Sequence, residues 1–230
     1  EALRINGITA TAAAGHSLGE YAAMVYTGMV SRTDGFKLIK ARSLAMQKAA
    51  ENSSGAMFAI IGSTPADIEK VCAETEGYVV PVNYNSSVQT VIAGEEAAAQ
   101  AAADTLAAAG ARAIRLNVAA AFHSKLMQGA ADEFKPAAEQ ISFKTPEITM
   151  LSNISGTVLD SIDNMPERLA LHIVSPVKFT SELAYLSENG YDTFIECGPG
   201  KVLTGLVKKT LKGVNAMNVQ DADTLAKVIG

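Results

Sequence analysis

The chain has 230 residues, of which 48% are hydrophobic and 19% charged, with a formal net charge of -5. This composition is typical of a packed globular protein and excludes a disordered one. No block of lysine and arginine points to nucleic acid, and the apolar runs are too short to span a membrane. The start of the chain has no signal-peptide pattern, and two cysteines make no disulfide framework, so we expect the cytoplasm.

The first elements predict a strand, a glycine turn and two helices. Residues 8–15 form a continuous run of small apolar residues, which is typical of a strand buried on both faces. Helices are expected over 18–27, closed by Gly28, and over about 33–51.

The pattern changes after residue 54. Alternating and periodic segments predict the order β-α-β-β-α-β, the split βαβ arrangement, over 56–62, 64–75, 78–85, 89–94, 95–110 and 111–118. We interpret 55–119 as a small domain inserted into a larger one, which comprises 1–54 and 120–230. In the second part of the larger domain we expect helices over 124–140, 167–174 and 176–189, a strand near 148–155 and a strand–turn–helix over 191–212.

A G-x-S-x-G motif, Gly15 to Gly19, lies between the first strand and the first helix. Such a turn exposes the hydroxyl of Ser17 and directs helix N-terminal amides at a developing oxyanion. The plainer interpretation is an ordinary glycine-flanked turn. The strand before the motif and the helix after it favour a nucleophile, which needs a base within hydrogen-bond reach.

Three histidines are candidates for that base. His16 adjoins the serine and points elsewhere, and His172 lies in an apolar helical stretch that indicates a structural role. His123 lies where the inserted segment returns to the larger domain, and clefts form at such junctions. The sequence leaves open whether His123 is a base or only packs at a helix start.

Arg42 has mostly apolar neighbours on its helix face. A buried guanidinium requires an anionic partner. That partner is either a protein carboxylate or, on the sharper hypothesis, the carboxylate of a substrate; a third interpretation lets the head group reach water.

Several motifs together resemble the malonyl-CoA:acyl carrier protein transacylases of fatty-acid synthesis. They are GHSLGEY, KARSLAMQ, NYNSSVQTVIAG, AFHSKLM and GPGKVLTGL, in this order. The resemblance covers nearly the whole chain and implies an α/β fold whose parallel-sheet core resembles the α/β-hydrolase type, with an inserted ferredoxin-like domain at 55–119.

The resemblance also implies roles for single residues. Ser17 would carry the acyl group, His123 would be its base, Arg42 would hold the malonyl carboxylate, and the Leu18 amide would form half of the oxyanion hole. The main-chain carbonyl of Lys178 would orient His123. Substrate-binding positions would further include His16, Met46, Asn85 and Gln89. No metal or redox cofactor is implied, and the partners would be malonyl-CoA and the phosphopantetheine arm of holo acyl carrier protein, with no nucleic acid and no membrane.

One departure from the family concerns its glutamine-rich opening motif, G-Q-G-x-Q, which this sequence does not contain. We interpret the early position of Ser17 as a truncation, and we expect a weakened oxyanion hole from it. Two rival functions stay open: a serine hydrolase acting on esters or thioesters, which would need a carboxylate behind His123, and a non-catalytic module that binds the carrier protein or coenzyme A.

Overall fold

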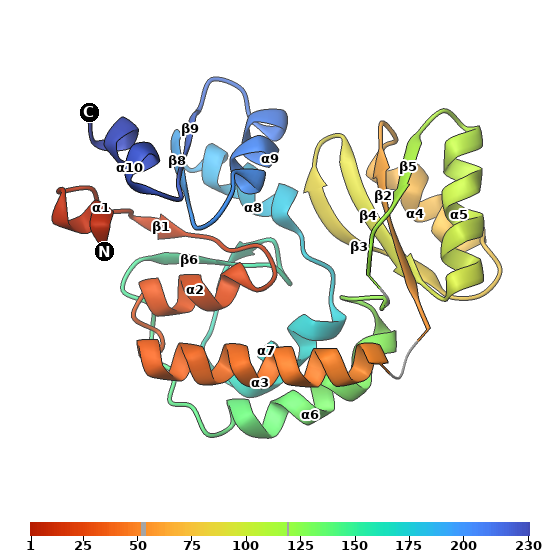
Figure 1. The fold of residues 1–230 in the computed structure, drawn as a ribbon, viewed down its shortest axis with the longest axis horizontal. Helices are drawn as coiled ribbons and strands as arrows, with labels where there is room; N and C mark the ends of the chain where they lie inside the picture. Colours follow the sequence, from red (N-terminus) through yellow and green to blue (C-terminus); the bar gives the residue numbers. More distant parts are fainter. Residues whose placement is uncertain (52–53, 119) are drawn as a thin grey trace.

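The computed structural model describes residues 1–51, 54–118 and 120–230. It has a mixed α/β fold made of a helical layer, two small sheets and a larger four-stranded sheet (Figure 1). Its short first helix, α1 (Ala2–Ile5), and its last, α10 (Ala222–Ile229), contact each other, so the two ends of the chain lie close together.

The helical layer is built on one buried apolar core. Tyr21, Met24, Leu38 and Phe134 are almost fully buried in it. A buried stripe on each helix supplies these residues, which is why the helices pack rather than stand alone. The layer consists of α2 (Gly19–Tyr26), α3 (Arg32–Glu51), α6 (Gln128–Ala138) and α7 (Met165–Val174), with the short 3-10 helix η1 (Lys125–Met127) before α6.

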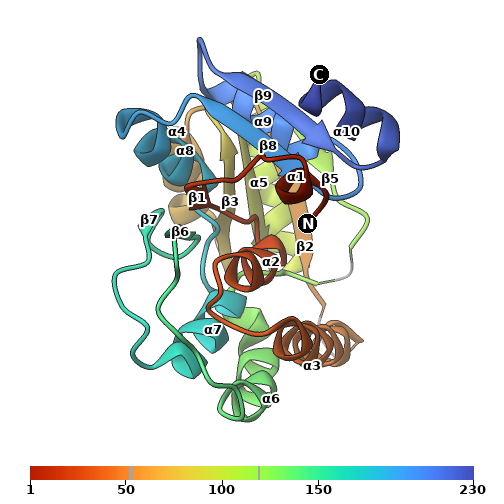
Figure 2. The ribbon, with the colours of Figure 1, turned by 90° about the vertical axis from the view of Figure 1, so that its left-hand side faces the viewer.

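The parallel strand pairs lie in two separate small sheets. Strand β1 (Ala12–Ala13) pairs parallel with β6 (Thr149–Ser152), and β6 pairs antiparallel with β7 (Thr157–Val158). Strand β8 (Thr193–Cys197) pairs parallel with β9 (Asn215–Val219). Figure 2 shows β1 between this second pair and α2. The strand expected over 8–15 is therefore much shorter than predicted, because only two of its residues pair.

The segment after residue 54 forms the four-stranded sheet, in the order β3-β4-β2-β5. All of its strand pairs are antiparallel. Two helices, α4 and α5, cover one face (Figure 1), and the alanines of α5 pack with Phe58, Ile60 and Ile92 in one cluster. Residue 119, the expected end of the inserted segment, lies outside the described residues. The elements are β2 (Ala56–Ile61), α4 (Pro65–Glu74), β3 (Val79–Ser86), β4 (Gln89–Gly94), α5 (Glu96–Ala108) and β5 (Arg112–Arg115).

The helix expected over 176–189 begins later than predicted. Helix α8 spans Phe179–Glu188, and α9 spans Val202–Thr210. The residues before α8 are extended because they pair with the four-stranded sheet. The Val177 amide donates to the Val82 carbonyl at 2.8 Å, and the Val177 carbonyl accepts from the Tyr84 amide at 2.9 Å. Backbone pairing thus overrides the preference of proline, here Pro176, for the first position of a helix.

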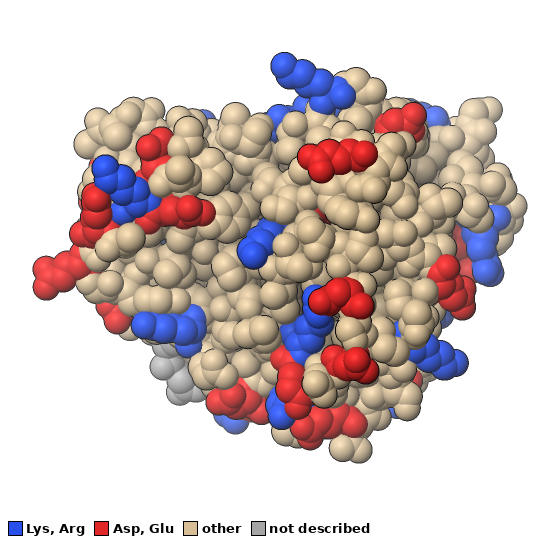
Figure 3. All heavy atoms as spheres, turned by 180° about the vertical axis from the view of Figure 1, so that it is seen from behind, with Lys and Arg blue, Asp and Glu red and all other residues tan. Residues whose placement is uncertain are grey.

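The face of the molecule drawn in Figure 3 carries both signs of charge. On the face seen in Figure 3, acidic and basic side chains alternate over a largely uncharged surface. Within the described part of the chain, no helix combines the length and the apolar character needed to cross a membrane. Cys72 is buried, whereas Cys197 is exposed, and neither forms a disulfide.

Candidate active site

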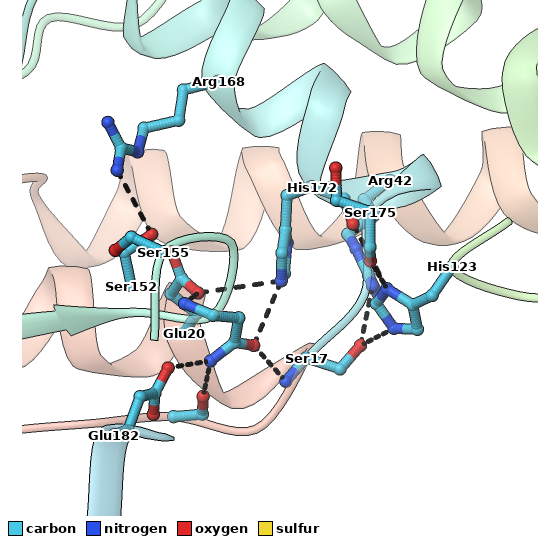
Figure 4. Close-up of polar contacts among 12 residues, drawn as sticks. Ser17, Glu20, Arg42, His123, Ser152, Ser155, Arg168, His172, Ser175 and Glu182 are labelled. Carbon is cyan, nitrogen blue, oxygen red and sulfur yellow. Dashed lines mark hydrogen bonds and ion pairs between the residues drawn. The ribbon is translucent and has the colours of Figure 1, made fainter. Parts of the chain in front are cut away.

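The turn that carries Ser17 is tight because the chain passes directly against the start of α2. A Cβ atom built on Gly15 would lie 2.1 Å from the backbone carbon of Gly19, so only glycine fits there. Ser17 itself has a φ of 52°, a left-handed conformation that is uncommon for serine. The turn projects the Ser17 hydroxyl away from the helix and towards His123 (Figure 4).

Ser17 and His123 are in direct contact. The distance from Ser17 Oγ to His123 Nε2 is 2.7 Å. On the other side of the ring, Nδ1 lies 3.1 Å from the carbonyl oxygen of Ser175 and 3.2 Å from that of His172 (Figure 4). Carbonyl oxygens only accept, so Nδ1 carries the proton and Nε2 is free to accept from the hydroxyl. This is the tautomer that a general base for Ser17 requires.

Burial keeps the His123 imidazole neutral. Desolvation is the main cause that lowers its pKa to about 4, and the positive charge of Arg42 lowers it further. The ring is only 4% exposed. At neutral pH His123 is therefore unprotonated at Nε2 and available to take a proton.

The prediction that Lys178 orients His123 is wrong. Its carbonyl accepts from the amides of Ser181 and Glu182 at the start of α8, at 3.1 and 3.2 Å. The carbonyls of His172 and Ser175 take the predicted role instead, because α7 ends there and its last carbonyls have no partner within the helix. The prediction of a main-chain carbonyl was thus right, but it named the wrong residue.

Arg42 lies beside the nucleophile and is deeply buried. It is 5% exposed, and its Nη2 donates to Ser17 Oγ at 3.0 Å (Figure 4). The guanidinium also lies over the ring of Tyr21, 5.5 Å from the centroid. Among the described residues, no carboxylate forms an ion pair with Arg42, and its Nε has no hydrogen-bond partner. The protein carboxylate that the sequence left possible is therefore not found in the described part of the chain.

Of the other predicted positions, His16 and Leu18 lie at Ser17, whereas Gln89 lies elsewhere. His16 lies at the site, and its Nε2 lies 2.7 Å from Asn85 Oδ1 on β3. Leu18 is the N-cap residue just before α2, and within the described ranges its amide donates to no group, so it stays available to an oxyanion. Gln89 pairs with Ser86 at the start of β4 and does not line the cavity beside Ser17.

A cavity of about 240 Å³ opens at the nucleophile. Its apolar walls include Met46, Met57 and Phe122, beside Ser17, Arg42 and His123. Substrate binding by Met46 stays a prediction. In the part of the chain that the structure describes, no three His, Cys, Asp or Glu side chains are arranged to hold a metal ion. The cavity thus joins an apolar wall, the hydrogen-bonded Ser17 and His123, and the Arg42 guanidinium, which has no carboxylate ion-pair partner among the described residues.

Asn153 is a residue in contact with Ser17 that sequence reasoning missed. It follows β6 and is fully buried, and its Oδ1 accepts from the Ser17 amide at 2.7 Å. The backbone amide of Asn153 donates to Glu20 Oε2 at 2.9 Å. An asparagine far away in the chain gives no periodic or spacing signal, and only its place after a buried strand, at the edge that carries the nucleophile, could have pointed to it.

The chain matches the family model of the acyl transferase domain over residues 1–229. The malonyl CoA-acyl carrier protein transacylase of Escherichia coli (strain K12) is 38% identical over 94% of this chain and 71% of its own length. That of Bacillus subtilis (strain 168) is 36% identical over 100% of the chain and 74% of its own.

Solved structures agree with these relatives. The transacylase of Clostridium perfringens superposes with a TM-score of 0.95 at 37% identity, over 99% of this chain and 73% of that one. A malonyl-transacylase solved in complex with a type II PKS acyl-carrier protein gives 0.92 at 35% identity, over 99% and 75%. The fold and the serine–histidine site define an acyl-transferring α/β protein. This chain belongs to the acyl transferase family.

Proposed function

We propose that this protein transfers a malonyl group from malonyl-CoA to the phosphopantetheine thiol of acyl carrier protein through a malonyl-Ser17 intermediate. The observation that carries the proposal is Arg42, a buried guanidinium without a carboxylate partner among the described residues, 3.0 Å from the nucleophile. An acyl group that ends in a carboxylate supplies the missing anion. The names of the relatives, malonyl transacylases, support the same substrate.

The contacts around Ser17 define the first half of the reaction. Ser17 Oγ attacks the thioester carbonyl carbon while its proton passes to His123 Nε2, which lies 2.7 Å away. The Leu18 amide faces the oxyanion that forms. When the carbon–sulfur bond breaks, the protonated His123 gives its proton to the departing sulfur of coenzyme A, and the malonyl ester stays on Ser17.

The second half reverses these steps with a new thiol. His123 removes the proton of the phosphopantetheine thiol, the sulfur attacks the ester carbonyl, and the Ser17 oxygen leaves with the proton that His123 returns. A malonyl ester is short, so its free carboxylate stays close to Ser17 Oγ and within reach of Arg42. A fixed fork beside the nucleophile therefore selects acyl groups with a terminal carboxylate.

The same contacts bear on the rival hydrolase. A Ser-His-Asp hydrolase orients its histidine with a carboxylate, whereas the acceptors of His123 Nδ1 are the carbonyls of His172 and Ser175. A hydrolase of simple esters also has no use for Arg42. The transferase is thus the function that the geometry favours.

We also propose a division of the chain. Residues 55–119 form a ferredoxin-like domain inserted between 1–54 and 120–230, which make a catalytic domain with a core of the α/β-hydrolase type. The order of the four-stranded sheet and the parallel pairing of β1 with β6 support this division. We place the protein in the cytoplasm, and its two unpaired cysteines support that compartment.

Intact-mass spectrometry after mixing with malonyl-CoA tests the function. We expect a stable malonyl adduct on the protein, its absence from Ser17→Ala, and its loss with malonyl transfer when holo acyl carrier protein is added. Release of free malonate at the same rate with and without the carrier protein would support the hydrolase instead. A folded protein that forms no adduct would support the binding module.

A further inference from the structure

We propose that Asn153 and His172 act as one pair of positioning residues that holds both the nucleophile and its base. The inference rests on the proposed function, because it concerns the geometry of Ser17 and His123 in that reaction. Neither residue touches the cavity at Ser17, and both are fully buried behind it. Their effect therefore passes through the two reacting residues.

The side-chain amide of Asn153 has all of its hydrogen-bonding positions filled. Its Nδ2 donates to the Gly15 carbonyl at 2.5 Å and to Glu182 Oε1 at 2.7 Å. Its Oδ1 accepts from the Ser17 amide at 2.7 Å and from His172 Nε2 at 3.1 Å. A backbone amide only donates and a carbonyl only accepts, so Ser17 and Gly15 fix which end of the Asn153 amide is which.

This orientation fixes the tautomer of His172 in turn. Since Asn153 Oδ1 is an acceptor, His172 Nε2 must carry the proton that bonds to it. Burial lowers the pKa of His172 well below its usual range, so the ring is neutral and its 3.6 Å approach to Glu20 is no ion pair. Figure 4 shows the imidazole between Glu20 and the Ser17 turn.

The backbone of His172 completes a closed ring of contacts. Its carbonyl oxygen lies 3.2 Å from His123 Nδ1, and His123 Nε2 lies 2.7 Å from Ser17 Oγ. Ser17, Asn153, His172 and His123 are thus joined in a circle by four hydrogen bonds. The Asn153 side chain holds the Ser17 amide, the His172 carbonyl holds the His123 ring, and the bond between the two side chains links these holds, so the distance between Ser17 and His123 follows from both.

The pair also supports backbone conformations that are costly alone. Ser17 and His123 have φ values of 52° and 61°, and left-handed backbone at such residues persists only where the surroundings hold it. Asn153 bonds on both sides of the strained turn, at the Gly15 carbonyl and the Ser17 amide. Loss of the His172 donor leaves Asn153 Oδ1 with one partner fewer and releases the hold on that turn.

Variants of His172 test the inference. His172→Leu removes the donor, whereas His172→Gln keeps an uncharged N–H donor on a side chain of similar reach. We measure the rate of malonyl-adduct formation and, independently of malonyl recognition, the rate at which a fluorophosphonate labels Ser17. We expect both rates to fall about tenfold to a hundredfold in His172→Leu, with the KM for malonyl-CoA nearly unchanged, and most of the loss to be recovered in His172→Gln.

A double-variant comparison separates positioning from plain stability. In a His123→Ala background the base is gone, so His172→Leu should lower the residual labelling rate by a smaller factor than it does when His123 is present. An equal fold-loss with and without His123 would overturn the inference, and so would an unrescued loss in His172→Gln. Circular dichroism checks the folded fraction, and His172→Met is the second apolar variant if the leucine lowers it.

The two reagents keep this inference distinct from the proposed function. If wild-type protein takes the fluorophosphonate but no malonyl group, the transferase proposal fails, and the labelling rates still decide the role of His172. If a folded wild-type protein takes neither reagent, Ser17 is no activated nucleophile and both proposals fall.

Discussion

Ser17 and His123 both have left-handed backbone, with φ values of 52° and 61°, and their side chains meet at 2.7 Å. Neither residue is glycine, so each conformation carries a cost that its surroundings must offset. The turn before α2 imposes the first, and the return of the chain from the four-stranded sheet into η1 imposes the second. Two strained positions that face each other are a mark of a site built for function.

Arg42→Ala should lose malonyl selectivity more than acylation chemistry. A charge-assisted fork contributes about 1.5–3 kcal/mol, so its removal should lower kcat/KM for malonyl-CoA roughly tenfold to a hundredfold. The rate with acetyl-CoA should stay level or rise, since no carboxylate is lost there. Parallel assays with both thioesters check this, and an equal fall in the two would make Arg42 a structural residue.

The pH profile of acylation should reflect the lowered pKa of His123. The base must be neutral at Nε2, and its pKa of about 4 lies below the ordinary histidine value of 6.5. Activity should therefore persist as the pH falls through the usual histidine range and decline only near the lower value. Fluorophosphonate labelling rates across pH measure this limb, with circular dichroism as the control for folding. A limb near the ordinary histidine value would contradict the burial effect.

Glu20 should make the protein less stable as the pH rises. Burial raises the pKa of this carboxyl from 4.5 to about 7, so the folded protein keeps a proton that the unfolded chain releases. The stabilisation from this proton is complete below the pKa of the unfolded chain, 4.5, and is lost as the pH rises towards the pKa of the folded protein, about 7.

Glu20→Gln isolates that contribution, because the amide oxygen can still accept from the Asn153 amide. Urea unfolding of both proteins at about pH 5 and about pH 8 measures it. Relative to the wild type, the free energy of unfolding of the variant should be higher at about pH 8 than at about pH 5 by on the order of 2–3 kcal/mol. An unchanged difference at the two pH values would show that Glu20 is not the group responsible.

Gly15→Ala and Gly19→Ala form a matched pair. A Cβ on Gly15 would meet the Gly19 backbone at 2.1 Å, whereas a Cβ on Gly19 meets nothing within 4 Å. The first change should cost at least about 1–3 kcal/mol of unfolding free energy because backbone must move, and the second should stay within about 0.5 kcal/mol. Thermal unfolding of both variants decides, and equal melting temperatures would refute the close approach.

The sequence predicted the local parts of the site better than the long-range ones. The G-x-S-x-G spacing and the strand before it located Ser17, and the apolar face of α3 identified Arg42, because each signal lies within a few turns of the chain. The order β-α-β-β-α-β was readable for the same reason, and its elements appear within a few residues of their predicted bounds.

The parts that were missed depend on pairing between distant segments. The carbonyls that orient His123 come from His172 and Ser175 rather than Lys178, since the backbone of Val177 pairs with β3 and delays the start of α8. The parallel pairs β1–β6 and β8–β9 lie in separate sheets, a division that no local pattern in the sequence predicts. No local pattern indicates that Asn153 reaches Ser17, because that contact joins residues 136 positions apart.

The pairing of Val177 with β3 ties two distant parts of the protein to one catalytic group. Val177 exchanges hydrogen bonds with Val82 and Tyr84, and two residues earlier the Ser175 carbonyl meets the His123 ring. The four-stranded sheet is therefore a buttress for the catalytic base as well as a wall of the cavity. Replacing that sheet with one from another acyltransferase will preserve activity only if its edge strand still pairs with the backbone of Val177. The same holds for shortening the segments that connect the sheet to the rest of the chain.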